Sequence, residues 1–242
     1  MQKTKIEWVK NPDGTQGYSW NPIKGICPVG CWYCYGKGYY ERFWHLHGYP
    51  VNFYENEIEQ VYKLKKPSGI FLCSIFEIFH DITKTDFKDS GEQYTSWRDC
   101  IFDTIEDNPQ HRFYVLTKFP QNIDRPMPDN VWLGVSITGN SKDDFMRASY
   151  FGFLPRKAKI QFISYEPLLE MPSYNIPHVD WIIIGKLTGY DHKYDPKREW
   201  IEKIISSEEA KSTPIFLKDN LKEIWGEPLI QEMPKTTQEK AI

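Results

Sequence analysis

Short apolar runs recur along most of this chain, and nearly every one is followed by a polar residue. Each run is almost continuously apolar and rich in β-branched or aromatic residues, without a regular alternation of polar positions. Such runs are typical of strands that are buried on both faces of a parallel sheet. The predicted strands are one around 18–26 and the runs 69–74, 112–117, 131–136, 160–164, 181–185 and 214–217.

Helical spacing of apolar side chains occurs between several of these runs. The segment after Cys34 predicts a helix that ends at Gly48, because glycine is favoured just past a helix end. Strands that alternate with helices through right-handed crossovers form a parallel sheet. We therefore expect an α/β fold with a mainly parallel sheet, open or curled into part of a barrel. Further helices are predicted near 58–65, 94–105, 143–151 and 200–205.

The chain has 242 residues, of which 40% are hydrophobic and 16% aromatic, enough for a substantial core. No long tract of Ser, Gly or Pro divides it, so we expect one domain over residues 1–231. Residues 232–242 are polar and are expected to form a C-terminal tail.

Charge and cysteine content narrow the class of protein. A net charge of −3 gives no bulk electrostatic reason to bind nucleic acid, although it is compatible with a local basic patch. No segment reaches the roughly 18 consecutive apolar residues that span a bilayer, and the start lacks the apolar core of a signal peptide. Five cysteines, three of them clustered, fit a reduced compartment and a metal site better than a disulfide framework. We expect a cytoplasmic protein without membrane contact.

Polar residues collect at the predicted carboxyl ends of the strands. In barrels and open α/β sheets, ligands bind at this edge. Lys118 and Glu166 follow two of these strands and are the candidate catalytic residues. They could recognise a cofactor carboxylate or a substrate, or they could form a structural ion pair at the rim. The polar residues at these ends are Ser74, Thr117, Lys118, Ser136, Ser164, Glu166, Lys186, Lys218 and Asp219.

The cysteines carry the most specific chemical signal in the chain. Cys27, Cys31 and Cys34 form the spacing C-x3-C-x2-C, with Tyr33 directly before the last thiol. Gly30 permits the sharp chain path that such a loop needs. Three thiolates can hold three corners of a 4Fe-4S cluster and leave the fourth iron open, whereas electron-transfer clusters normally take four protein thiolates. The loop therefore predicts a metal site that is prepared to bind a further ligand.

Two non-enzymatic interpretations of these cysteines stay open. His45 could join them in a structural zinc site, although zinc modules of this kind are usually small domains that need the metal to fold. Cys73 or Cys100 could supply a fourth thiolate, which would make the chain a redox-sensing iron–sulfur protein. Cys100 lies in a predicted helix and is expected in the core, whereas Cys73 stands at a strand end.

The cysteine spacing and its aromatic residue resemble the signature of the radical S-adenosylmethionine (radical SAM) enzymes. From about residue 4 to residue 221 the chain also resembles a phage- and prokaryote-associated three-cysteine-motif family that has no settled substrate. The resemblance implies a partial (β/α)6 TIM-like barrel with the cysteine loop after the first strand. The stretches that carry it are 20–27, 71–81, 115–118, 130–136 and 162–169.

The resemblance also implies a reaction. A 4Fe-4S cluster on Cys27, Cys31 and Cys34 would reductively cleave S-adenosylmethionine with an electron from an external donor. The product is a 5′-deoxyadenosyl radical that abstracts hydrogen from a substrate. A nucleic-acid base is one candidate substrate, suggested by the phage association alone.

The remaining cofactor contacts are carried over by position. Tyr33 is expected near the adenine of S-adenosylmethionine. The family's Gly-Gly-Glu after the second strand, which holds the methionine amine, is absent, and Ser74 and Glu77 stand in its place. Ser136, at the end of the fourth strand, is the candidate for the ribose hydroxyls. Gly185 is followed by a lysine where members often carry a second glycine, so no contact is carried over there.

Overall fold

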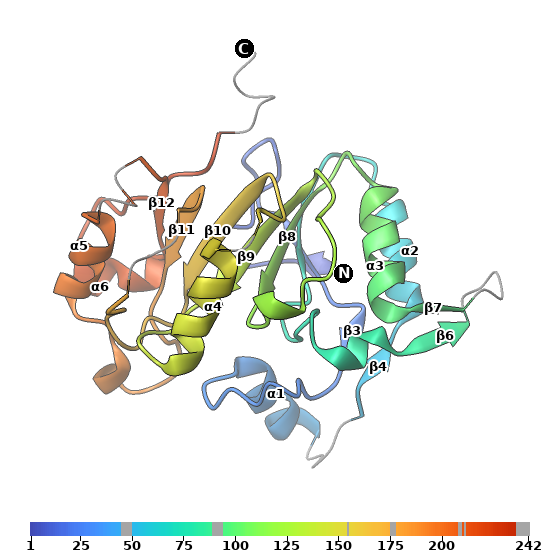
Figure 1. The fold of residues 1–242 in the computed structure, drawn as a ribbon, viewed down its shortest axis with the longest axis horizontal. Helices are drawn as coiled ribbons and strands as arrows, with labels where there is room; N and C mark the ends of the chain where they lie inside the picture. The colour runs from blue at the N-terminus through green and yellow to red at the C-terminus, as the bar shows by residue number, and fades with distance from the viewer. Residues whose placement is uncertain are drawn as a thin grey trace. The chain divides into compact units, whose positions relative to one another are not determined.

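The computed structural model describes residues 1–44, 50–88, 94–153, 155–174, 178–207, 210 and 212–235. The chain forms two compact units, Met1–Val131 and Trp132–Ile242, and most of their helices and strands are labelled in Figure 1. The predicted single domain over residues 1–231 stays a prediction.

The sheet of the first unit consists, in spatial order, of β1 (Gln2–Lys3), β2 (Tyr18–Trp20), β5 (Gly69–Leu72) and β8 (Arg112–Thr117). The last three strands run parallel, and β1 pairs antiparallel with β2. In this register Leu72 lies between Trp20 and Val115, and all three are buried. Apolar side chains therefore stack across the sheet, as the continuous apolar runs predict.

Among its described residues the first unit has the helices α1 (Tyr35–Trp44), α2 (Glu55–Tyr62) and α3 (Trp97–Glu106). The last two lie side by side (Figure 1) and bury Val61, Ile101 and Ile105. α3 begins after Ser96, whose hydroxyl accepts the backbone N–H of Asp99. This cap satisfies one of the donors that a helix start leaves unpaired.

Short ribbons and turns complete the described part of the first unit. They are β3 (Ile23–Lys24) with β4 (Asn52–Phe53), β6 (Asp86–Lys88) with β7 (Tyr94–Ser96), and the 3-10 helices η1 (Asp81–Lys84) and η2 (Pro120–Asn122). In the β3–β4 ribbon, β3 ends at Lys24, shortly before the cysteine loop. It therefore fixes where that loop starts.

The second unit holds four parallel strands in its described part, β9 (Val131–Ser136), β10 (Ile160–Tyr165), β11 (Trp181–Ile184) and β12 (Ile215–Leu217), paired in this order. The ring of Trp181 packs 5.6 Å from that of Phe162 and 6.1 Å from that of Phe216. These rings form the centre of its core. Its described part includes the helices α4 (Lys142–Phe153), α5 (Arg198–Ile205), α6 (Lys222–Trp225), η3 (His192–Tyr194) and η5 (Asp219–Leu221).

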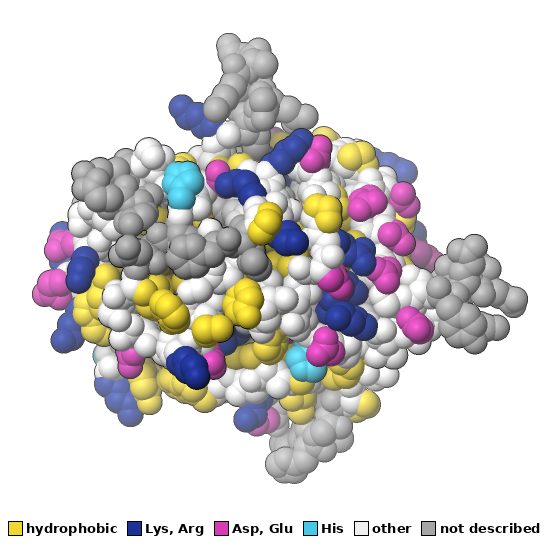
Figure 2. Space-filling view, viewed as in Figure 1, with side chains coloured by type: hydrophobic (Ala, Val, Ile, Leu, Met, Phe, Trp, Pro, Cys, Tyr) yellow, Lys and Arg dark blue, Asp and Glu magenta, His cyan; other side chains and the backbone are white. Residues whose placement is uncertain are grey.

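Hydrophobic side chains gather on the surface over α4 (Figure 2). Phe145, Met146 and Tyr150 are exposed, while Ala148 and Phe151 face the interior. The helix thus buries one side and presents several large apolar groups on the other. None of the helices that the structure describes is both long and apolar enough to cross a membrane.

The α/β class with a mostly parallel sheet is confirmed. β8 and β9 have the predicted bounds, but the strand expected around 18–26 is two short strands, because Pro22 lacks the N–H that a ladder needs. The helix predicted from Tyr94 is wrong at its start, since Tyr94 opens β7. Within each unit the strands run in an open order. The curl into a partial (β/α)6 barrel stays a prediction.

Only part of the predicted C-terminal tail, residues 232–242, lies among the described residues. Glu232, assigned to the tail, donates its N–H to Ile215 at 2.8 Å and accepts the indole N–H of Trp181 at 2.9 Å. It therefore packs with the second unit. Residues 236–242, like the helix end expected at Gly48, lie outside the described residues.

Gly69→Ala is expected to destabilise the protein by about 3 kcal/mol, because overpacking costs about 1–3 kcal/mol and occasionally more. A Cβ there would overlap the carbonyl oxygen of Lys10 and lie 2.7 Å from its carbonyl carbon, and backbone atoms cannot rotate away. Urea denaturation measures the free energy of unfolding. In the control Gly38→Ala, nothing lies within 4 Å of the new Cβ. That change should be neutral or stabilising by up to about 1 kcal/mol, and equal losses in both variants would contradict the close approach.

Candidate functional site

The three clustered cysteines lie in a loop that joins β3 to α1. Two tight turns shape it: the N–H of Gly30 donates to the carbonyl of Cys27 at 3.3 Å, and that of Cys34 to the carbonyl of Cys31 at 3.1 Å. Gly30 has a φ of 67°, in the left-handed region that glycine adopts without steric cost. The loop therefore turns back on itself before the helix begins.

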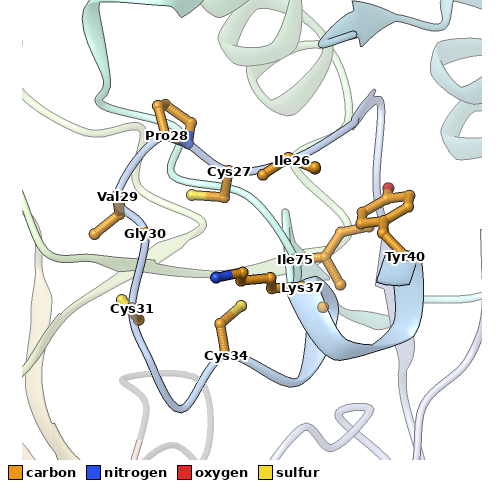
Figure 3. Close-up of a pocket in the computed structure, with 11 residues that line it drawn as sticks. Ile26, Cys27, Pro28, Val29, Gly30, Cys31, Cys34, Lys37, Tyr40 and Ile75 are labelled. Atoms are coloured by element: carbon orange, nitrogen blue, oxygen red, sulfur yellow. The ribbon is translucent and has the colours of Figure 1, made fainter. Parts of the chain in front are cut away.

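All three cysteines line one pocket with a volume of about 280 Å³ (Figure 3). Each is a free thiol. The sulfur atoms of Cys27 and Cys34 point toward the space that the loop encloses, and the ammonium group of Lys37 reaches into the same space. The other lining residues are Ile26, Pro28, Val29, Gly30, Cys31, Gly36, Tyr40 and Ile75.

The described residues do not form a compact site for a single metal ion. Within them, no group of three or more His, Cys, Asp or Glu side chains is arranged to hold one ion. Cys27, Cys31 and Cys34 share the pocket but are spread around it (Figure 3). His45, the fourth ligand of the zinc alternative, lies outside the described residues.

Burial keeps one thiol of the pocket protonated. It raises the pKa of Cys27 to about 11, and the negative charge of Glu77 acts in the same direction. The backbone N–H groups of Val29 and Glu77 donate to this sulfur and favour the thiolate, but they do not offset the burial. Because metals bind the thiolate, a metal or cluster has to displace this proton.

A buried carboxylate lies next to the cysteine loop. Glu77 is 5% exposed and accepts hydrogen bonds from the Thr117 hydroxyl at 2.6 Å, the Lys118 N–H at 2.7 Å and the Phe79 N–H at 3.1 Å. It joins the segment after β5 to the end of β8, and its own N–H donates to Cys27. Glu77 therefore holds the loop in place, and its predicted contact with the methionine amine stays a prediction.

Three further predicted residues lie around the loop in the first unit. The ammonium nitrogen of Lys118 is 5.8 Å from the centre of the Tyr33 ring, a cation–π distance. The carbonyl of Ser74 accepts the hydroxyl of Tyr35, the first residue of α1, at 3.2 Å. Tyr33, Ser74, Glu77 and Lys118 therefore come together with the cysteines, although they are far apart along the chain.

Ser136 and Glu166, the other predicted site residues, lie in the second unit. Ser136 is buried at the end of β9, directly opposite Ser164 of β10. Glu166 forms an ion pair with Lys218, which follows β12. The alternative pairing of Glu166 with Lys118 would join the two units and stays a prediction.

Sequence reasoning missed the partner of Glu166 and part of the pocket wall. Glu166 and Lys218 are 52 residues apart, and the parallel strands between them bring them together. Gly185 leaves room for the pair, since a Cβ there would lie 2.7 Å from the Lys218 side chain. A local signal did exist for Lys37, because it follows Cys34 by three residues and so faces the same side of the helix start.

Comparison with known proteins places the chain in one family. A family profile described as "Protein of unknown function (DUF5131)" matches residues 3–241. The chain belongs to this family. No curated protein and no solved structure matches the chain. The family's description names no reaction, so the resemblance to radical SAM enzymes and to a three-cysteine-motif family stays a prediction.

The donor set of the pocket fits an iron–sulfur cluster. Soft thiolates are the ligands that such clusters take, and three of them share this space. Backbone N–H groups donate to the sulfur of Cys27, a kind of hydrogen bond that tunes cluster potentials. Neither Cys73 nor Cys100 is among the described residues that line the pocket.

Glu77→Gln is expected to lower the free energy of unfolding by about 1–3 kcal/mol. The amide offers a single acceptor oxygen and turns an NH2 group toward one of the three donors that now face the carboxylate. Urea denaturation at neutral pH measures the loss. Glu59→Gln is the matched control, because it breaks only an exposed pair with Lys63 and should cost less than about 0.5 kcal/mol. Similar losses would show that the buried contacts of Glu77 add nothing.

Proposed function

We propose that this protein is a radical SAM enzyme whose 4Fe-4S cluster is held by Cys27, Cys31 and Cys34. One observation carries the proposal: these three cysteines, and no other cysteine among the described residues, line a single pocket. Three thiolates leave one iron of such a cluster without a protein sulfur. S-adenosylmethionine would bind at that position.

The bound cofactors would supply the chemistry, namely reductive cleavage of S-adenosylmethionine to methionine and a 5′-deoxyadenosyl radical that takes hydrogen from a substrate. The chain's own residues would bind and orient the cofactors and exclude water from the pocket. Ile26, Val29 and Ile75 form apolar walls beside the thiols. Such walls protect a reactive radical from side reactions with solvent.

The two other cysteines support an iron that is open to S-adenosylmethionine. Cys73 is buried, and its sulfur accepts a hydrogen bond from the backbone N–H of Ile23. Burial also raises the pKa of the Cys73 thiol well above its ordinary value. Cys100 lies on α3 near Tyr62 of α2 and is partly exposed, which corrects the expectation that it is a core residue.

The predicted contacts to S-adenosylmethionine keep their assignments in this proposal. In the first unit, Tyr33 would face the adenine, and Ser74 and Glu77 the methionine amine. A carboxylate has about four acceptor positions, and protein donors occupy three of those on Glu77. One position therefore remains for an ammonium group. In the second unit, Ser136 would bind the ribose hydroxyls.

Anaerobic purification tests the proposal. The protein should be brown, with about four irons and four sulfides per chain. With dithionite it should convert S-adenosylmethionine to 5′-deoxyadenosine, which chromatography with mass detection measures. Cys27→Ala, Cys31→Ala and Cys34→Ala should each reduce this conversion to background, because each removes a cluster ligand. Cys100→Ala, the matched control, should retain it.

Other results would replace the proposal with a different function. Colourless protein that carries about one zinc per chain would indicate a structural zinc module. Brown protein that leaves S-adenosylmethionine intact would indicate a redox-sensing iron–sulfur protein. Loss of the cluster in Cys73→Ala would show a fourth protein ligand and no open iron.

A further inference from the structure

Lys37 carries the only charged side chain among the described residues that line the cysteine pocket. It lies on α1, three residues after Cys34, so both face the same side of the first helical turn. Figure 3 shows its ammonium group extending into the space bounded by the cysteines. Lys37 thus brings a positive charge to a pocket that is otherwise lined by apolar groups, cysteines and one phenol.

The surroundings of Lys37 determine how strongly this charge acts. Its side chain is 49% exposed, and its ammonium nitrogen lies 3.8 Å from a carboxylate oxygen of Glu41. Water and this carboxylate therefore screen part of the charge. The hydroxyl of Tyr40, the phenol of the pocket, accepts the N–H of Gly25 at 3.0 Å. Among the described residues that line the pocket, Lys37 is therefore the group that brings a full positive charge.

We propose that Lys37 sets the reduction potential of the cluster that Cys27, Cys31 and Cys34 bind. This inference rests on the proposed function. Each thiolate brings a negative charge, and one-electron reduction makes the bound cluster more negative still. A cation in the pocket stabilises the reduced form more than the oxidised form. Net charge around a cluster is among the factors that determine its potential. Lys37 therefore makes the cluster easier for an external donor to reduce.

Three other sources of charge act on the same site. The ammonium group of Lys118, which lies 5.8 Å from the centre of the Tyr33 ring, favours reduction. Glu77 lies close enough to Cys27 to raise the pKa of its thiol, so it opposes reduction. The N-terminus of α1, directly after Cys34, carries a partial positive charge and favours reduction. A substitution at Lys37 leaves all three in place. The difference between the two proteins therefore reports the ammonium group of Lys37 alone.

The midpoint potential of the anaerobically loaded protein tests the inference. It is measured by redox titration with electron paramagnetic resonance, in the absence of S-adenosylmethionine. At the wild-type midpoint, Lys37→Met should lower the ratio of reduced to oxidised cluster about three- to tenfold, a shift of roughly 30–60 mV to more negative potential. Lys37→Arg keeps the charge and should stay near the wild-type value. High salt should reduce the shift.

Lys63→Met is the matched control for loss of a positive charge. Lys63 is exposed at the end of α2 and pairs with Glu59, so its loss should leave the potential unchanged. If Lys37→Met does not take up the cluster, Lys37→Gln, which keeps a polar end without charge, decides the question.

The outcomes separate this inference from the proposed function. An unchanged potential in the loaded Lys37 variants, or an equal shift in Lys63→Met, overturns the inference and leaves the radical SAM proposal intact. Wild-type protein that takes up no iron–sulfur cluster overturns the proposed function itself.

Discussion

The buried carboxylate of Glu77 holds the candidate site together. It accepts hydrogen bonds from the segment after β5 and from the end of β8, while its own N–H donates to the sulfur of Cys27. Burying a carboxylate is costly unless several donors replace the lost water, and here three do so. The side chain of Glu77 thus fixes the segment after β5 against the end of β8, and its backbone N–H ties the cysteine loop to that segment.

Local patterns predicted the apolar strands of the parallel sheet and failed for the short antiparallel ribbons. β8 and β9 were found at their true bounds because each is a continuous apolar run that ends in polar residues. The ribbons β3–β4 and β6–β7 were missed, since their strands of two or three residues mix polar and apolar positions and form no apolar run. Tyr94 was placed in a helix on apolar spacing, although Ser96, a favoured helix cap, begins α3 after it.

The candidate site, like the fold, could be predicted from the sequence only in part. The cysteine loop could be predicted because its ligands and its turning glycine lie within one short segment. The partners of the two site carboxylates, Glu77 and Glu166, could not be predicted. Thr117 and Lys118 are 40 and 41 residues from Glu77, and Lys218 is 52 residues from Glu166. Pairing of parallel strands brings such residues together, and no local pattern in the sequence records it.

α1 shares its stability with the cysteine loop. The helix has 10 residues, fewer than the roughly 12–15 that an isolated helix needs in water, and its first turn carries no acidic residue to favour the N-terminus. Tyr40 ties it instead to the N–H of Gly25, just ahead of the loop. Helix and loop must therefore become ordered as one piece. Oxidation of a single thiol to a sulfinic acid would loosen an entire helix along with the pocket.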